Sequence, residues 1–169
     1  MPYKNNETVL VLVYARDTGR LLMLQRKDDA DFWQSVTGSL EPQELPVQAA
    51  WREAHEELGF NRIVPDNADL LANGTIWAHS KLMDGQYAVQ FEIFPQYRHK
   101  YAPDVTHCLE HWFLLETPQE FTPLLTEHLA FQWLEPVQAA QLTKSWNNAL
   151  AIERYFLKEG EQNDTNATN

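Results

Sequence analysis

The stretch from Pro46 to Leu58 places the strongest constraint on the fold, because its polarity repeats with the period of an α-helix. Proline is well placed in a first helical turn, and Gly59 stands where a left-handed stop residue is expected. Charged side chains gather on one side of this helix. The apolar stripe on the other side consists of Val47, Ala50, Trp51, Ala54 and Leu58. We therefore predict an amphipathic helix over Pro46 to Leu58.

Strand-forming sequences lie on both sides of this helix. Two apolar runs separated by the turn residues Asp17, Thr18 and Gly19 predict an N-terminal hairpin. The predicted strands are Thr8 to Ala15, Arg20 to Arg26, Phe32 to Val36, Tyr87 to Arg98 and Trp112 to Glu116, and the later helices are Pro136 to Leu142 and Asn147 to Lys158. This order favours an α/β or α+β sandwich with a central mixed sheet. Between Gly59 and Gly85 the signals are mixed and predict no definite element.

Length and composition indicate one domain. The chain has 169 residues and is 44% hydrophobic, which suits a single core over residues 1–158, followed by a polar tail, 159–169, expected to be disordered. The formal charge of -11 argues against a nucleic-acid or anionic-membrane binder. With one cysteine, no signal-peptide pattern in Met1 to Asp17 and no membrane-length apolar run, we expect a cytoplasmic protein without a membrane role. The sequence predicts no oligomeric state.

The polar face of the predicted helix carries three glutamates in register. Glu53, Glu56 and Glu57 are spaced i, i+3 and i+4, so their carboxylates converge and repel one another. A solvated face, with Arg52 and Glu56 as an exposed ion pair, is the plain alternative. A divalent cation would remove the repulsion, and carboxylate oxygens with open positions opposite suit Mg²⁺. The spacing favours half of a metal site.

The segment from Gly38 to Phe60 reads GSLEPQELPVQAAWREAHEELGF and resembles the Nudix signature. That signature is glycine, five residues, glutamate, seven residues, then Arg-Glu-apolar-any-Glu-Glu-any-Gly-apolar, and every fixed position is filled here. Ala54 is smaller than the bulky aliphatic residue usual at its place, which concerns packing rather than chemistry. The resemblance implies an α/β/α sandwich and a hydrolase of phosphoanhydride bonds that uses Mg²⁺, for which Mn²⁺ can substitute.

The resemblance also implies roles for particular residues. Glu53, Glu56 and Glu57 would bind the metal, and Arg52 would orient their carboxylates. Gly38 would let the loop pass closely under the helix, and Glu44 would complete the acidic cluster through water or a hydrogen bond. We expect Glu57 to be exposed, so that its loss would leave the core intact.

Further segments resemble one bacterial branch of this family, the dihydroneopterin triphosphate pyrophosphohydrolases of folate biosynthesis. They are LLMLQRKDDADFWQSVTGS from Leu21, FEIFPQYRHKYAPDVTHCLEHWF from Phe91, FTPLLTEHLAFQWL from Phe121 and LTKSWNN from Leu142. This likeness implies that Glu127 is an additional metal ligand rather than the base. It also implies a set of substrate contacts: Lys4, Arg26, Thr37, Phe91, Glu92, Ile93, Phe94 and Ser145.

Several interpretations stay open at this point. Arg26 suits a phosphate, and Phe91 and Phe94 suit a flat ring, but an ordinary surface position and core packing are the alternatives. Arg98, His99 and Lys100 form a basic cluster that suits either phosphates or a solvated edge. The substrate is then a small molecule, either the pterin or a nucleoside triphosphate. A nucleotide-sensing module without activity is the alternative of another class, and an RNA end-processing enzyme is disfavoured by the acidic charge.

Overall fold

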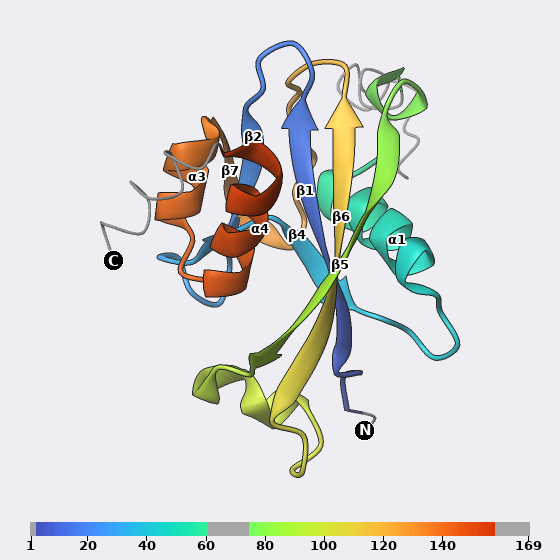
Figure 1. Ribbon diagram of the computed structural model, residues 1–169, viewed down its shortest axis with the longest axis vertical. Helices are drawn as coiled ribbons and strands as arrows, with labels where there is room; N and C mark the ends of the chain where they lie inside the picture. The colour runs from blue at the N-terminus through green and yellow to red at the C-terminus, as the bar shows by residue number, and fades with distance from the viewer. Residues whose placement is uncertain (1–2, 61–74, 158–169) are drawn as a thin grey trace.

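In the computed structural model, which describes residues 3–60 and 75–157, strand β1 (Glu7–Ala15) runs through the centre of a seven-stranded mixed sheet (Figure 1). Its partner on one side is β6 (His107–Thr117), which runs parallel to it from the pair Glu7–Leu109 to the pair Ala15–Thr117. Strand β5 (Lys81–Glu92) pairs antiparallel with β6 and closes that side of the sheet.

The other side of β1 is shared by two strands. Strand β4 (Val36–Ser39) pairs with the first half of β1, and β2 (Leu21–Arg26) pairs with its end at Tyr14. Strand β2 in turn pairs with β3 (Trp33–Gln34) and β7 (His128–Leu134). Because β4 and β2 pair with different parts of β1, these two strands diverge from each other, and a cavity opens on this side of the sheet.

Helices cover both faces of the sheet, which confirms the predicted sandwich (Figure 1). Side chains of a strand alternate between its faces, so Val9, Val11 and Val13 pack toward α1 (Pro46–Leu58). The intervening residues Leu10 and Leu12 pack toward α3 (Pro136–Leu142) and α4 (Trp146–Phe156). Strand β1 therefore belongs to both cores, and its apolar run is continuous because both faces are buried.

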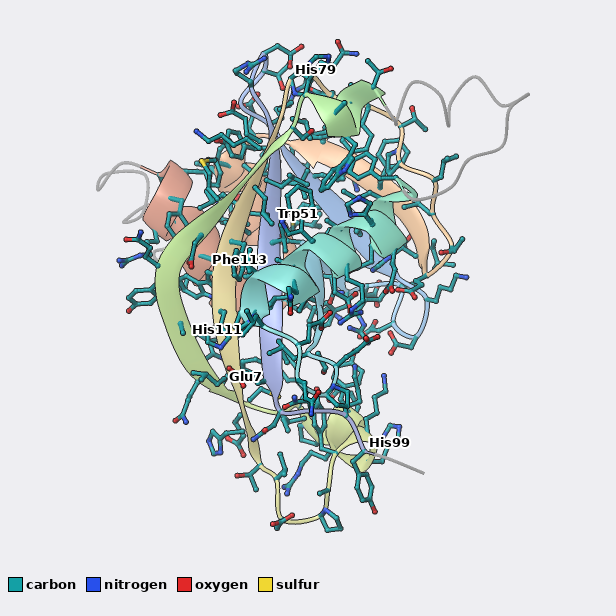
Figure 2. The ribbon with its side chains drawn as sticks, turned by 90° about the vertical axis from the view of Figure 1, so that its right-hand side faces the viewer. Glu7, Trp51, His79, His99, His111 and Phe113 are labelled. Carbon is teal, nitrogen blue, oxygen red and sulfur yellow. The ribbon has the colours of Figure 1, made fainter. Side chains whose placement is uncertain are left out.

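Helix α1 has the predicted bounds, and Gly59 ends it in a left-handed conformation with φ of 78°. The predicted apolar stripe is partly wrong. Ala49, Ala50, Ala54 and Leu58 are buried together with Glu53 and Glu57, whereas Val47 and Trp51 are 42% and 40% exposed. The helix is rotated so that two carboxylates face inward, and its small alanines let it lie close to the sheet. Figure 2 shows α1 crossing this face, with Trp51 on the helix and Phe113 on the sheet.

Several other elements depart from the predictions. In place of the strand predicted over Phe32 to Val36 the structure has β3, which ends at Gln34, and β4, which begins at Val36. The strand predicted over Tyr87 to Arg98 begins earlier and stops at Glu92, and Pro95–Lys100 forms a 3-10 helix, η1, because proline cannot donate to a sheet ladder. Strand β6 begins at His107 rather than Trp112. Strand β7 was not predicted, since its residues alternate too weakly to indicate a strand from local sequence.

Within the segment between Gly59 and Gly85, for which the sequence predicts no element, residues 61–74 lie outside the described residues, and so does the whole predicted tail. The described part of this segment contains a helical turn at 75–78 and the start of β5. That turn places Trp77 against Trp51, with ring centroids 4.4 Å apart. Among the described residues there is no helix long and apolar enough to cross a membrane.

Candidate functional site

A cavity of about 380 Å³ opens on the α4 side of the sheet, between the splayed ends of β1 and β4, the start of α4 and the helix η1. Ten of the residues predicted as site residues line it: Lys4, Arg26, Thr37, Gly38, Glu57, Phe91, Ile93, Phe94, Glu127 and Ser145. They come from four strands and helices, β2, β4, α1 and β5, and from loops far apart in the sequence. The fold therefore brings most of the predicted site into one space.

Glu57 is the carboxylate that α1 contributes to the cavity wall. Its side chain is 1% exposed, contrary to our expectation, and its Oε2 has no hydrogen-bond partner among the described residues. Burial, followed by the nearby carboxylates of Glu53 and Glu127, raises the pKa of Glu57 well above its ordinary value. A buried carboxylate with an orphan oxygen is costly unless a cation or donor completes it.

Glu53 lies one turn before Glu57 and presses against the backbone of β4. A Cβ atom added to Gly38 would stand 2.2 Å from the Glu53 carboxylate, so only glycine leaves room for it. Burial raises the pKa of Glu53, although Arg52 opposes this shift. The glycine at this place is therefore required by the carboxylate, because its own φ is not left-handed.

Arg52 ties the acidic residues together. Its Nε and Nη2 donate to the two oxygens of Glu44 at 2.8 Å each, and its Nη1 donates to Glu53 Oε1 at 2.8 Å and to Glu56 Oε2 at 3.4 Å. Nη2 also donates to the carbonyl of Ser39 on β4 at 3.0 Å. The pair lowers the pKa of Glu44 and raises that of Arg52. Arg52 thus fixes the helix, the loop before it and β4 relative to one another.

Beside Glu57 the cavity wall carries His128, the first residue of β7, and Glu127 just before it. Glu127 is exposed and lines the cavity, while His128 is buried with its Nε2 3.4 Å from Glu57 Oε1. Burial and the nearby cations Arg26 and Lys27 lower the pKa of His128 to about 4, so its ring is neutral near pH 7. The contact with Glu57 is therefore not an ion pair at neutral pH.

Four cationic side chains line the cavity: Lys4, Arg26, Lys27 and Lys100. Arg26 forms a bidentate pair with Asp28, with both bonds at 2.7 Å, which lowers the pKa of Asp28 to about 2. Its Nη1 donates to Gln34 Oε1 at 3.1 Å. Of the basic cluster predicted at Arg98, His99 and Lys100, only Lys100 lines the cavity, and the other two are exposed. The cavity therefore contains cationic side chains alongside four acidic ones, Asp28, Glu57, Glu110 and Glu127.

Apolar side chains form the rest of the wall. Phe91, Ile93 and Phe94 come from the end of β5 and the residues after it, and Phe32 lies 6.0 Å from Phe94, centroid to centroid. Glu92, also predicted as a substrate contact, is exposed and does not line the cavity. Successive residues of a strand point to opposite faces, so Glu92 cannot share the face of Phe91.

Sequence reasoning missed Glu110 and Asn147, which are 3% and 4% exposed and line the cavity. Glu110 Oε1 accepts hydrogen bonds from Trp112 Nε1 at 3.0 Å and from Asn147 Nδ2 at 2.6 Å. Burial raises the pKa of Glu110 to about 7, and these two bonds oppose the rise. The available signal was the alternation Cys108, Glu110, Trp112, which places a charge on the buried face of β6.

The acidic cluster is not closed around an ion. No three histidine, cysteine or acidic side chains in residues 3–60 and 75–157 are arranged to enclose one, and Arg52 donates hydrogen bonds to Glu53 and Glu56. The donor atoms nevertheless suit a hard cation, because they are all oxygens. They include the unpartnered oxygen of Glu57 and the Glu53 carboxylate that lies against Gly38. The residues fit such a group, and their role as ligands stays a prediction.

Comparisons with known proteins show the family and the fold. A family profile described as NUDIX domain matches residues 4–155. A protein of Haemophilus influenzae named dihydroneopterin triphosphate diphosphatase is 50% identical over 92% of this chain and 90% of its own, and one of that name from Escherichia coli K12 is 48% identical over 92% and 95%. The solved structure of the E. coli dihydroneopterin triphosphate pyrophosphohydrolase superposes with a TM-score of 0.78, covering 92% of this chain and 97% of that one at 48% identity.

Proposed function

This chain belongs to the Nudix family, and from that premise we propose that it is a metal-dependent pyrophosphohydrolase that converts dihydroneopterin triphosphate and water to dihydroneopterin monophosphate and pyrophosphate. One observation carries the proposal. One cavity brings Glu57 and Glu127 together with cationic side chains and an aromatic wall, so it can hold a phosphate chain and a flat ring together. The likeness to proteins named for this activity supports the choice of ring.

We propose Mg²⁺ as the cofactor, with Mn²⁺ able to substitute. Glu53 and Glu57 would hold it, with Glu56 and Glu127 as further carboxylates on either side. When bound, such an ion offsets the negative charge of the phosphate chain and the leaving group and lowers the pKa of a water. The buried Glu57, with its orphan oxygen, is the side chain whose environment improves most when a cation is present.

The other residues of the chain would bind and orient the substrate. Lys27 and Lys100 place ammonium groups on the cavity wall, where they can neutralise phosphate oxygens. Arg26 can contribute its charge only alongside Asp28, because the carboxylate already occupies its bidentate edge. Arg52 acts as a positioning residue, since it holds Glu53 and Glu44 at 2.8 Å and lies behind the wall. Water is the nucleophile, and no covalent intermediate with the protein is expected.

The test is a set of initial rates on dihydroneopterin triphosphate and the common nucleoside triphosphates, with Mg²⁺, with Mn²⁺ and with a chelator, with products identified by mass. We expect metal-dependent release of pyrophosphate and a higher kcat/KM for the pterin. A preference for a nucleotide would move the enzyme to nucleotide metabolism. Absence of turnover with every substrate would favour a sensing module, and turnover that survives the chelator would contradict the metal site.

Glu57→Gln and Glu92→Gln form a matched pair for this assay. Both replace a carboxylate by an amide, but Glu57 lines the cavity and Glu92 does not. The first change should abolish turnover and the second should leave it unchanged. Equal effects of the two substitutions would show that the loss has nothing to do with the proposed site.

A further inference from the structure

Lys4 differs from the other cationic side chains of the cavity, because its ammonium group has no acidic partner within bonding distance among the described residues. Asp28 pairs with Arg26 at 2.7 Å and with Lys100 at 3.7 Å, and Lys27 Nζ donates to a backbone carbonyl. For Lys4 the described part of the chain provides neither a salt bridge nor a side-chain hydrogen bond. Its amino group is therefore held by no other group of the wall.

The position of Lys4 makes this amino group accessible from solvent. Lys4 precedes β1, is exposed as a residue and lines the cavity. The N-terminal segment passes beside η1, where the backbone N–H of Lys4 donates to the carbonyl of Lys100 at 2.9 Å (Figure 2). The two lysine side chains thus start from neighbouring points of the backbone and line the same cavity. A molecule that enters the cavity meets both of them.

Two features of this position favour the neutral form of the amine. The surrounding wall withdraws the amino group from water, and the charge of Lys100 disfavours a second cation, so the pKa of Lys4 lies below its ordinary value, although Glu53 opposes the shift. A lysine attacks a carbonyl carbon only through its neutral amine, and a lysine that is desolvated or next to another cation is activated for that reason. At a given pH, more of Lys4 than of an ordinary exposed lysine is able to react.

The cavity also provides a means of orienting a reagent. Its cations, among them Lys27 and Lys100, give it affinity for phosphate groups. In an acyl phosphate, a single oxygen joins the phosphorus to a carbonyl carbon that is activated for attack. A phosphate bound at Lys100 therefore brings that carbon close to Lys4. An acylating reagent without a phosphate has no such orientation.

We propose that Lys4 is a modification site for acyl phosphates such as acetyl phosphate, which acylate its amino group. The nitrogen attacks the carbonyl carbon, the bond from that carbon to the bridging oxygen breaks, inorganic phosphate leaves, and the nitrogen loses one proton to water. The product is an uncharged amide. Acylation thus removes one cation from the cavity and weakens the binding of phosphate-bearing substrates. The inference rests on the proposed function only for the phosphate affinity of the cavity.

The test is to incubate the full chain with acetyl phosphate and Mg²⁺ at pH 8 and to follow the acetylation of each lysine by peptide mass spectrometry. Lys4 should react about 10-fold faster than Lys81, an exposed lysine that does not line the cavity. Inorganic pyrophosphate should protect Lys4 and leave the rate at Lys81 unchanged. Equal rates at the two lysines would overturn the inference, as would the absence of protection.

Acetic anhydride separates orientation by the phosphate from the nucleophilicity of the amine. It acylates amines without presenting a phosphate, so its preference for Lys4 over Lys81 should be smaller than that of acetyl phosphate. An equal preference with both reagents would overturn the role of the cavity. Lys100→Gln should slow acetylation of Lys4 by acetyl phosphate about 10-fold, because it removes both the phosphate partner and the neighbouring charge. Lys81→Gln is the matched control and should leave that rate unchanged.

The mass measurement does not require turnover, which separates this inference from the proposed function. If no substrate is hydrolysed but Lys4 is acetylated selectively, the proposed function fails and the modification site stands. If the enzyme is active and Lys4 reacts no faster than Lys81, the reverse holds.

Lys4→Arg tests the consequence for binding, since it keeps the cation but cannot be acylated at pH 8. Treatment with acetyl phosphate should raise KM of the acetylated wild type about 10-fold, whereas Lys4→Arg should keep the KM that it had before treatment. An equal rise in both proteins would overturn the claim that acylation of Lys4 weakens binding.

Discussion

Replacing Gly38 by alanine tests whether the position of the Glu53 carboxylate matters to the reaction. The added Cβ would lie 2.2 Å from the Glu53 carboxylate, against 3.4 Å for an ordinary contact, so the carboxylate must move by about 1.2 Å. A misplacement of this size in a catalytic group costs on the order of 100-fold in rate, or about 2.7 kcal/mol of transition-state stabilisation. The φ of Gly38 is not left-handed, so the substitution adds no backbone strain of its own.

The assay is the initial rate as a function of Mg²⁺ concentration, with the melting temperature measured on the same samples. For Gly38→Ala we expect a rate near one hundredth of wild type, a higher half-saturating Mg²⁺ concentration and a small change in melting temperature. Gly19→Ala is the control, because Gly19 has φ of 74° with no atom within 4 Å of the added Cβ. It should cost about 1 kcal/mol of stability and no activity. An unchanged rate and Mg²⁺ dependence in Gly38→Ala would refute the placement of Glu53 at the reaction centre.

Two further predictions follow from the charges around the cavity. Burial raises the pKa of Glu57 above its ordinary 4.5, so ionisation of this carboxylate weakens the metal-free fold as pH rises. The melting temperature of metal-free Glu57→Gln should therefore exceed that of wild type at pH 8, by a margin that vanishes toward pH 4.5. An equal margin at both pH values would contradict this. Arg52→Lys loses the bidentate pair with Glu44 and should lower kcat by about 100-fold and weaken Mg²⁺ binding. Both effects are measured from initial rates as a function of Mg²⁺ concentration. An unchanged Mg²⁺ dependence would exclude a positioning role for Arg52.

Local sequence predicted those parts of the fold whose boundaries are marked by single residues. Helix α1 begins at Pro46 and ends before Gly59 as predicted, because these two residues restrict the backbone wherever the helix lies. The rotation of the helix could not be predicted in this way. Which stripe is buried depends on the partner surface, and here the small side chains of Ala49 and Ala50 face the sheet while Trp51 stays 40% exposed.

In the candidate site, too, local features could be predicted from the sequence, whereas features that depend on distant segments could not. The spacing of Glu53, Glu56 and Glu57 follows from one helix and was visible in the sequence, whereas the burial of Glu57 required the position of β4 and β7. Glu110 and Thr8 are neighbours only through the pairing of β1 with β6, which joins residues 102 positions apart. The alternation of side chains that turns Glu92 away from the cavity could be predicted from local sequence, but the extent of β5 could not.

The same pairing of β1 with β6 governs how the chain reaches its fold. During synthesis the valine- and leucine-rich β1 emerges early, yet its parallel partner, residues 107–117, emerges about a hundred residues later. Until then its apolar run has no partner on that side and exposes a strand edge on which other chains can align. Contacts of such long sequence separation also make folding slow. Expression at low temperature or with chaperones should therefore raise the soluble yield of this protein more than any substitution on its surface.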